Sequence, residues 1–402
     1  MNSHHQSARF LMRLAAALHR YGTPTHRLEE AINKVSSMLN VEGQYLVTPT
    51  SIMASIGPEG EQEMRLLRVD SGETNLEKLA SLNDVMRRAG TGETDVETAA
   101  DEVQTICAAP LRYIKPLTVL GYTIVSGAAT AMFGGGLNEL VVGMVVGTLL
   151  GLLAVAALGR PRLTRPYPAL ASFLATMTSG FATLVLEPLH PFISTLGGLI
   201  VLVPGLALTI AINELASGHV VSGSSRLVST LMTFLQMGIG VAFGTLLLSA
   251  AGIVVDGGTP VQFSAWFLAL WLPLAAAGFT ILFRARPRDF PWILLASVIA
   301  FLGARYTAEL AGPVAGAACG AWALGSTSNV LARLRDEPAV ITLLPGLLLL
   351  VPGSIGFRSV EAMIRDDILS GIEAGVSMGL TAMALVTGLL LANLTIESRK
   401  LL

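Results

Sequence analysis

The segment Ile193–Gly205 reads ISTLGGLIVLVPG, and the segment Ile341–Gly353, 148 residues further along the chain, reads ITLLPGLLLLVPG. The two segments share Ile, Leu, Gly, Leu, Leu, Val, Pro and Gly in one register, and the same offset places Ser222-Gly223 on Ser370-Gly371. Matching leucines arise by chance in apolar helices, but a Val-Pro-Gly motif and a distant Ser-Gly pair at one offset do not. We therefore infer an internal duplication, a feature of many membrane transporters.

The composition places both copies in a membrane. Apolar residues make up 52% of the 402 residues and charged residues 13%, whereas soluble domains carry about 25% charged residues. From residue 116 onward, apolar stretches long enough to cross about 30 Å of hydrocarbon follow one another. We count ten such spans, at residues 116–135, 137–158, 168–186, 192–212, 228–250, 263–283, 290–309, 311–331, 339–357 and 371–394.

Each copy of the duplicated unit contains five of these spans, within residues 114–251 and 252–402. Because five is odd, the second copy enters the membrane from the opposite face. The predicted fold is therefore an α-helical polytopic membrane protein with ten transmembrane helices in an inverted 5+5 repeat. A small cytoplasmic α+β domain, residues 1–113, precedes the helices.

The first 115 residues contain 27 of the 54 charged residues, which indicates a part of the chain that lies in water. Apolar residues at helical spacing predict a first helix that ends at Gly22 and a second helix with Thr23 as N-cap and Pro24 in its first turn. The second helix is predicted over residues 24–39. After it we expect a β-hairpin over 44–56 and 65–69, and helices over 75–89 and 94–109.

The cationic loops predict which side of the membrane each loop occupies, because cytoplasmic loops retain Lys and Arg. With the N-terminal domain inside, the loops on its side and the C-terminal tail carry eleven Lys and Arg residues, and the opposite loops carry three. The N-terminal sequence MNSHHQSARF has no apolar run after a basic start, so we expect no cleaved signal peptide. Both termini are therefore predicted to be cytoplasmic.

Charge and cysteine content exclude several classes of function. The formal net charge is −2 and no basic stripe is present, so we expect no nucleic-acid partner. Cys107 and Cys319 form no CxxC or His-containing cluster, so we expect neither a disulfide framework nor a metal site. No cofactor is expected, and the lipid bilayer is the predicted surrounding.

The duplicated Val-Pro-Gly motif predicts a substrate site. Pro204-Gly205 and Pro352-Gly353 each interrupt an apolar helix near mid-membrane, since proline blocks its continuation. Transporters with inverted repeats place substrate at such broken helices, whose free N–H groups attract a carboxylate. The alternative is a structural kink, and the symmetric pair of breaks favours the site.

Two sets of polar residues are further candidates. The first set lies within predicted spans and would line the path, although each member also has the option of bonding to its own helix: Thr176, Thr178, Ser179, Gln236, Ser326, Thr327, Ser328 and Asn329. The second set follows the two breaks and would serve coupling or gating, with an ordinary solvated loop as the alternative: Asn213, Glu214, His219, Ser222, Gly223, Glu361, Asp366, Asp367, Ser370 and Gly371. Arg305 and Glu309 are predicted to pair with each other.

The motif Gly22-Thr23-Pro24-Thr25-His26-Arg27-Leu28-Glu29, followed by ten spans with VPG at 203–205 and SG at 222–223, resembles the threonine/serine exporter family. Residues 8 to 250 are similar to the family's N-terminal region and the last five spans to its smaller second region, which some relatives make as a separate chain. The resemblance implies export of threonine and serine across the bacterial inner membrane, driven by the proton-motive force. It leaves homo-oligomerisation open. Leu28-Glu29 departs from the more usual Val-Glu and keeps the helical register.

Three alternatives remain open at this point. Two-component relatives in the family are associated with dicarboxylates, and a passive channel would also explain ten spans with polar linings. A hydrolase anchored to the membrane would use His19, His26, Glu29 and Asp70 of the N-terminal domain. No GxSxG, HExxH, P-loop or GxGxxG motif accompanies these residues, so an enzyme is not expected.

Overall fold

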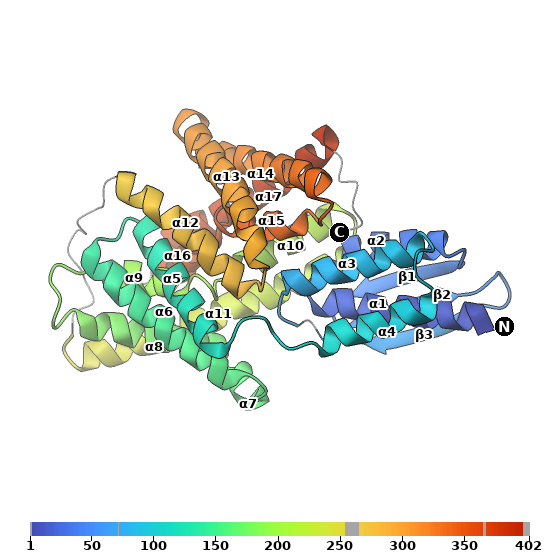
Figure 1. Cartoon of the computed structure of the whole chain (residues 1–402). Coiled ribbons are helices and arrows are strands. Elements are labelled where there is room, and N and C mark those ends of the chain that lie inside the picture. The colour runs from blue at the N-terminus through green and yellow to red at the C-terminus, as the bar shows by residue number, and fades with distance from the viewer. Residues whose placement is uncertain (1, 71, 254–264, 365–366, 397–402) are drawn as a thin grey trace.

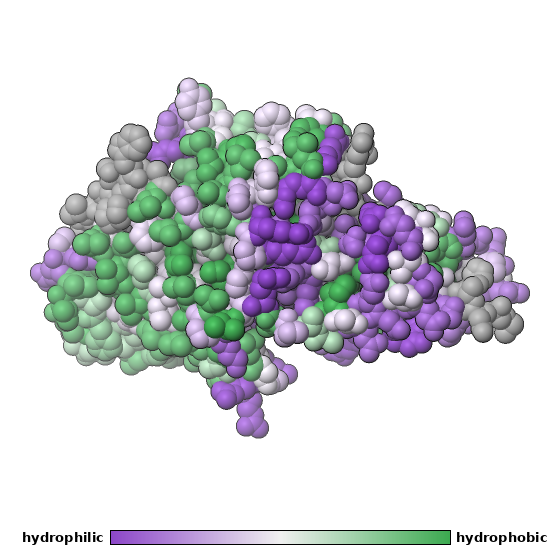
Figure 2. Space-filling view, in the orientation of Figure 1, coloured by the Kyte–Doolittle hydropathy of each residue, from purple (hydrophilic) through white to green (hydrophobic). Residues whose placement is uncertain are grey.

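The computed structural model describes residues 2–70, 72–253, 265–364 and 367–396. Figure 1 shows two parts, an N-terminal domain at one end and a larger helical region from Lys115 onward. Figure 2 shows that hydrophilic residues gather on the N-terminal domain, whereas hydrophobic residues cover most of the visible surface of the helical region.

The N-terminal domain packs helices against a three-stranded antiparallel sheet with the order β1-β2-β3. Its core is a continuous apolar cluster that includes Phe10, Leu14, Leu28 and Ile52. The elements are α1 (Asn2–Arg20), α2 (Thr25–Met38), β1 (Gly43–Thr48), β2 (Ser51–Ile56), β3 (Glu63–Arg68), α3 (Leu76–Gly90) and α4 (Val96–Ala108).

Two details of the predicted N-terminal domain are wrong. The stretch 44–56 is two strands and not one, because a turn at Pro49 and Thr50 separates them and the Ser51 N–H donates to Thr48 Oγ1 at 3.0 Å. Helix α2 begins at Thr25, so its N-cap residue is Pro24 and not Thr23. Pro24 has no side-chain group that could accept a hydrogen bond from the first turn of the helix.

The helical region follows the predicted spans closely. Within the described residues, each predicted span lies on a helix or, at the two breaks, on a pair of short helices; residues 263–264 of the sixth span lie outside the described residues. The elements are α5 (Lys115–Met132), α6 (Leu137–Ala157), α7 (Pro161–Thr164), α8 (Tyr167–Ala182), α9 (Pro191–Leu199), α10 (Gly205–Ala216), α11 (Val220–Ala250), α12 (Ala265–Leu282), η1 (Pro287–Asp289), α13 (Phe290–Ala311), α14 (Pro313–Arg335), α15 (Val340–Leu348), α16 (Gly353–Ile364) and α17 (Ile368–Thr395).

Five helical segments among the described residues are long and apolar enough to cross a membrane: Leu137–Ala157, Val220–Ala250, Pro287–Ala311, Val340–Met363 and Ile368–Thr395. Others are short, as α8 is, or rich in small and polar residues, as α14 is. The protein is therefore a helical membrane protein.

The two helix breaks lie directly against each other. A Cβ atom placed on Gly205 would lie 2.0 Å from Val351 Cγ1 and 3.0 Å from Gly353 Cα. Conversely, a Cβ atom on Gly353 would lie 2.5 Å from Val203 Cγ1 and 3.3 Å from Gly205 Cα. The contact is reciprocal, since each glycine faces the valine of the other Val-Pro-Gly motif.

The Ser-Gly pairs occupy matching positions as well. Gly223 lets α11 approach α10, because a Cβ there would meet Leu215 at 2.7 Å and the Ala211 carbonyl oxygen at 2.9 Å. Gly371 lets α17 approach α16 in the same way, with Met363 Cγ at 2.6 Å and the Ser359 carbonyl oxygen at 3.1 Å. All three residues of the second contact follow those of the first by 148 positions.

The N-terminal domain contacts two loops of the helical region. At the loop between α12 and η1, the Leu76 N–H donates to the Phe283 carbonyl at 2.9 Å and the Tyr113 hydroxyl donates to the Ala285 carbonyl at 2.8 Å. Arg286 continues this contact by donating to Ser81 Oγ at 3.2 Å. The second contact, at the turn between α10 and α11, carries most of the buried polar groups.

Candidate functional site

Glu214 caps helix α2 from another part of the chain. Thr25 is the first residue of α2, and its backbone N–H and hydroxyl donate to Glu214 Oε1 at 3.1 and 2.9 Å. Arg226 on α11 donates to both oxygens of the same carboxylate, at 3.1 and 3.3 Å. Glu214 is fully buried, and these donors together with the positive end of the α2 dipole offset the cost of removing its charge from water.

Two histidines extend this contact. Asn213 Nδ2 donates to His26 Nε2 over 3.2 Å, and His219 Nε2 donates to Glu29 Oε2 over 3.0 Å. The two imidazole rings lie 6.0 Å apart, centroid to centroid. The other oxygen of Glu29 accepts the Val47 N–H at 2.7 Å, so the same carboxylate joins α2, strand β1 and the turn before α11.

Burial lowers the pKa of two histidines near this contact, His26 and His19. The pKa of His26 is lowered to about 4, chiefly by desolvation, with Arg27, His219 and Arg226 acting in the same direction and Glu214 opposing them. Desolvation also lowers the pKa of His19, whose ring lies 3.2 Å from the Thr48 carbonyl. At neutral pH His26 is therefore uncharged, and its Nδ1 has no hydrogen-bond partner among the described residues.

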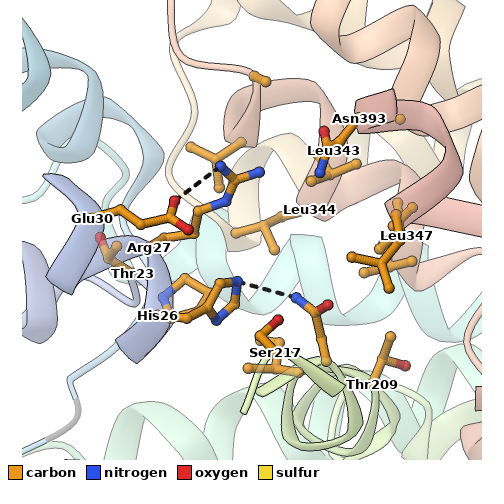
Figure 3. Close-up of a pocket in the computed structure, with 18 of the residues that line it drawn as sticks. Thr23, His26, Arg27, Glu30, Thr209, Ser217, Leu343, Leu344, Leu347 and Asn393 are labelled. Carbon is orange, nitrogen blue, oxygen red and sulfur yellow. Dashed lines mark hydrogen bonds and ion pairs between the residues drawn. The ribbon is translucent and has the colours of Figure 1, made fainter. Parts of the chain in front are cut away.

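A cavity of about 210 Å³ opens beside this contact, between the N-terminal domain and helices α10, α14, α15 and α17 (Figure 3). Its lining combines leucines with hydroxyl and amide groups, and the charged side chains in it are Arg27 and Glu30, with an Nη1 to Oε2 distance of 3.5 Å. The polar lining residues are Thr23, His26, Arg27, Glu30, Thr209, Asn213, Ser217, Asn329 and Asn393.

Figure 3 shows the arrangement of these side chains. Arg27 and Glu30 lie together on the side formed by α2, and Leu343, Leu347 and Asn393 lie on the other side. Asn329 Nδ2 donates to Asn393 Oδ1 at 3.0 Å and to the Ile396 carbonyl at 2.7 Å, which fixes both amides. The cavity far exceeds the roughly 10–15 Å³ that one water needs, so it admits a small polar molecule.

The structure brings together only part of the predicted site. Asn213 and Asn329 line the cavity, and Glu214 and His219 lie at the domain contact. Ser222 joins them by donating to the Val47 carbonyl at 3.1 Å. Gly223 shapes the α10–α11 turn, as described above, and the residues of the two breaks contact one another and do not belong to the cavity lining.

The other predicted path residues lie apart from the cavity. Thr176 and Thr178 donate to carbonyls of their own helix, those of Ser172 and Leu174. The remaining members are buried or half-buried within helices: Ser179, which accepts from Ser194 Oγ at 3.3 Å, Gln236, Ser326, Thr327 and Ser328. The Ser326 and Ser328 hydroxyls are buried without a hydrogen-bond partner in the part of the chain that the structure describes.

The candidates after the second break are also outside the cavity. Glu361 lies on α16, and Asp367 caps α17 by accepting the Ser370 N–H at 3.2 Å. Gly371 packs against α16, and its carbonyl accepts from Ser359 Oγ at 2.5 Å. Asp366 lies outside the described residues. The contacts of Asp367 and Gly371 thus lie within the helical region, whereas Glu214, His219 and Ser222 contact the N-terminal domain.

Sequence reasoning missed several residues of this site. Arg27 belongs to the motif quoted for the family, but nothing in the neighbouring sequence indicates that its side chain lines a cavity. Glu30, Thr209, Ser217 and Asn393 are ordinary polar residues in the sequence, and only the packing of distant helices gathers them.

The residues considered for a hydrolase are largely engaged at the domain contact. His19, His26 and Glu29 each bond to protein groups there, and Asp70 is an exposed residue of the N-terminal domain. Within the described ranges, no group of three or more His, Cys, Asp or Glu side chains is arranged to hold a metal ion.

Comparison with known proteins matches nearly the whole chain to one family. Residues 9–248 match the family model described as "Putative threonine/serine exporter", and residues 268–395 match the model described as "Threonine/Serine exporter". A comparison with solved structures found no match.

Curated relatives include proteins named pheromone-regulated membrane protein 10. The chain is 27% identical to that of Eremothecium gossypii over 391 residues, covering 93% of this chain and 50% of the relative. Identity to that of Yarrowia lipolytica is 27% over 390 residues, covering 91% and 31%. The chain thus spans half or less of the length of these relatives. The two family models together match residues 9–248 and 268–395, well over half of the chain, so the chain belongs to the threonine/serine exporter family.

Proposed function

We propose that this protein exports the small hydroxy amino acids threonine and serine from the cytoplasm, driven by the proton-motive force. Membership of the threonine/serine exporter family supports the transported class. The observation that carries the proposal is the cavity between the N-terminal domain and the helical region, which offers a small polar solute a site near the cytoplasmic ends of the helices.

The charges of the cavity favour a zwitterion over a dicarboxylate. One guanidinium, from Arg27, and one carboxylate, from Glu30, balance each other in its lining. A dicarboxylate would place two negative charges near a single cation and beside Glu30, and like charges at close range repel. An amino acid brings one charge of each sign, and the surrounding amides and hydroxyls suit a hydroxyl side chain.

We further propose that the ten helical spans form an inverted 5+5 repeat that works by alternating access. The reciprocal contact of Gly205 with Val351 and of Gly353 with Val203 supports a two-fold relation between the copies. In this proposal the paired breaks close the path beyond the cavity, and they part to let the substrate carboxylate meet the first N–H groups of α10 and α16.

The polar residues near the breaks and turns complete the proposed path. Thr176, Thr178, Ser179, Gln236 and Ser326 to Ser328 would line it, and the two turns after the breaks would serve coupling or gating. Glu214 and His219 are the strongest of the gating candidates, because both hold the N-terminal domain in place.

We propose a bacterial cytoplasmic membrane, with both termini in the cytoplasm. The N-terminal domain contacts the turn before Arg226 and the loop that carries Arg284 and Arg286, so these cations share its side of the molecule. That arrangement agrees with the rule that cytoplasmic loops are positively charged.

Efflux from proteoliposomes tests the proposal. Liposomes containing the purified protein are loaded with radiolabelled threonine, serine or succinate, and efflux is followed with and without an imposed pH gradient. We expect threonine and serine to move against their own gradient when the pH gradient is present. Succinate transport without threonine transport would favour the dicarboxylate alternative, and flux that only runs downhill would indicate a channel.

A further inference from the structure

The cytoplasmic N-terminal domain supplies charged groups to the cavity that the helical region lacks. Arg27 and Glu30 both come from α2, one turn apart, whereas the described lining residues of α10, α14, α15 and α17 are apolar side chains, amides and hydroxyls. Any solute charge in this cavity therefore meets its counter-charge on the N-terminal domain and not on the membrane helices.

The two side chains are only loosely paired. Their closest N to O distance is 3.5 Å, longer than the 2.7–2.9 Å of a charge-assisted hydrogen bond, and Glu30 is 64% exposed. By contrast, the Arg226 to Glu214 pair beside them has distances of 3.1 and 3.3 Å and a fully buried carboxylate. An exposed i,i+3 pair contributes little to stability, so both groups retain free donor and acceptor capacity.

On this basis, and resting on the proposed function, we infer that Arg27 and Glu30 form a clamp for a zwitterionic α-amino acid. The Arg27 guanidinium donates to the α-carboxylate, for which its planar fork is suited, and Glu30 accepts from the α-ammonium. The substrate then inserts between the two side chains and replaces their weak mutual contact. Asn213 and Asn393, which line the same cavity, are placed for the substrate side chain.

The inference assigns the N-terminal domain a direct role in substrate recognition. It also assigns the substrate class, because both an ammonium and a carboxylate on one small molecule are needed to engage the pair. A dicarboxylate or an amine lacking the carboxylate engages only half of the clamp.

Equilibrium binding to the full-length purified protein tests the clamp. Ligands are L-threonine, L-threonine amide, which lacks the carboxylate, and 3-hydroxybutyrate, which lacks the ammonium. We expect Arg27→Gln to raise the Kd for threonine by about tenfold to a hundredfold, since one charge-assisted bond is lost, and to change the Kd for the amide by less than threefold. Glu30→Gln is expected to raise the Kd for threonine by a similar factor, and to leave the Kd for 3-hydroxybutyrate unchanged or lower it.

Matched controls separate this effect from a general change in charge. Arg13 on α1 has the same side-chain exposure as Arg27, 32%, and a similarly weak partner in Asp101. Glu63, at 67% exposure, matches Glu30 at 64%. Arg13→Gln and Glu63→Gln should leave the Kd for threonine at the wild-type value.

The charge-swapped variant Arg27→Glu with Glu30→Arg distinguishes a clamp from a merely structural ion pair. If the ion pair only stabilises α2, the swapped variant should bind threonine as the wild type does. In that case the single variants should also lower the thermal midpoint and change the Kd for threonine and for its amide equally. Either result overturns the clamp. Efflux by the wild-type protein is measured in parallel. If the wild type transports threonine and Arg27→Gln binds it normally, the clamp alone is wrong, whereas a wild type that neither binds nor transports any α-amino acid contradicts the proposed function itself.

Discussion

At the scale of single residues, Gly205 and Gly353 are constrained by each other. An added methyl group at Gly205 would lie 2.0 Å from Val351 Cγ1, a distance that real carbon atoms do not adopt, so the two breaks would have to separate. We expect Gly205→Ala to destabilise the protein by about 1–3 kcal/mol, the usual cost of overpacking. The thermal midpoint of the purified protein measures this loss.

Two controls make the glycine prediction specific. Val351→Ala removes the colliding Cγ1 atom, so the double variant Gly205→Ala with Val351→Ala should lose less stability than the sum of the two single variants. Gly379 on α17 has nothing within 4 Å of an added Cβ, so Gly379→Ala should be neutral or slightly stabilising. Additive losses in the double variant would show that the breaks do not touch.

Residues that local sequence does not identify are those whose partners lie far along the chain. The neighbours of Thr23 predict it as the N-cap, but the side chain that accepts a hydrogen bond from the first N–H of α2 is that of Glu214, 189 positions after Thr25. Arg27 and Glu30 likewise line a cavity whose other walls come from distant helices, among them α10, α15 and α17. Composition and periodicity indicate which face of a helix is apolar. They do not indicate which distant carboxylate accepts the N–H groups at the start of that helix.

At the scale of elements, helices were predicted well and the sheet less well. Helical periodicity and the Pro-Gly breaks are local signals, and the bounds of α2, α3 and α4 fall within two residues of the predicted ranges. The turn between β1 and β2 has no glycine or asparagine; a Thr48 side chain closes it instead, so the two strands appeared as one stretch.

The docking of α2 on the α10–α11 turn should depend on pH through His26. Its pKa is about 4 when docked and is expected near the ordinary 6.5 when the contact opens. Because the docked pKa is the lower one, the open state binds the proton more readily. Docking is therefore fully stable above pH 6.5 and loses stability as pH falls from 6.5 towards 4, by about 3 kcal/mol in all.

Hydrogen exchange of a peptide containing Thr25 measures this effect, since its N–H donates to Glu214 only when α2 is docked. After correction for the intrinsic exchange rate, the wild-type protein should lose protection between pH 6.5 and 5. His26→Gln keeps an acceptor for Asn213 and should show a smaller loss, whereas His5→Gln, on the exposed start of α1, should behave as the wild type does. Equal pH dependence in wild type and His26→Gln would contradict the role of His26.

At the scale of the whole molecule, the division of the chain follows from the distribution of charge. Half of the charged residues lie before residue 116, and the structure places them in a separate domain at one end of the helices. The sequence predicts a repeat because the Val-Pro-Gly motif and the Ser-Gly pair recur at one offset. The cavity between domain and helices could not be predicted, since its walls come from segments that are up to 370 residues apart, as Thr23 and Asn393 are.

The proposed ten-span topology makes a prediction about which residues face the outside of the cell. In a Cys107→Ser, Cys319→Ser background, single cysteines are introduced at four exposed positions and treated with an impermeant thiol reagent on intact cells. Val185, 83% exposed after α8, and Ala311, at the end of α13, should react from outside in this topology. Met64, 75% exposed on the N-terminal domain, and Arg162, in the short helix α7 that follows α6, should react only after the membrane is permeabilised. Because an odd number of crossings separates Val185 and Ala311 from the N-terminal domain, labelling of Met64 and Val185 from the same side would rule out the inverted arrangement.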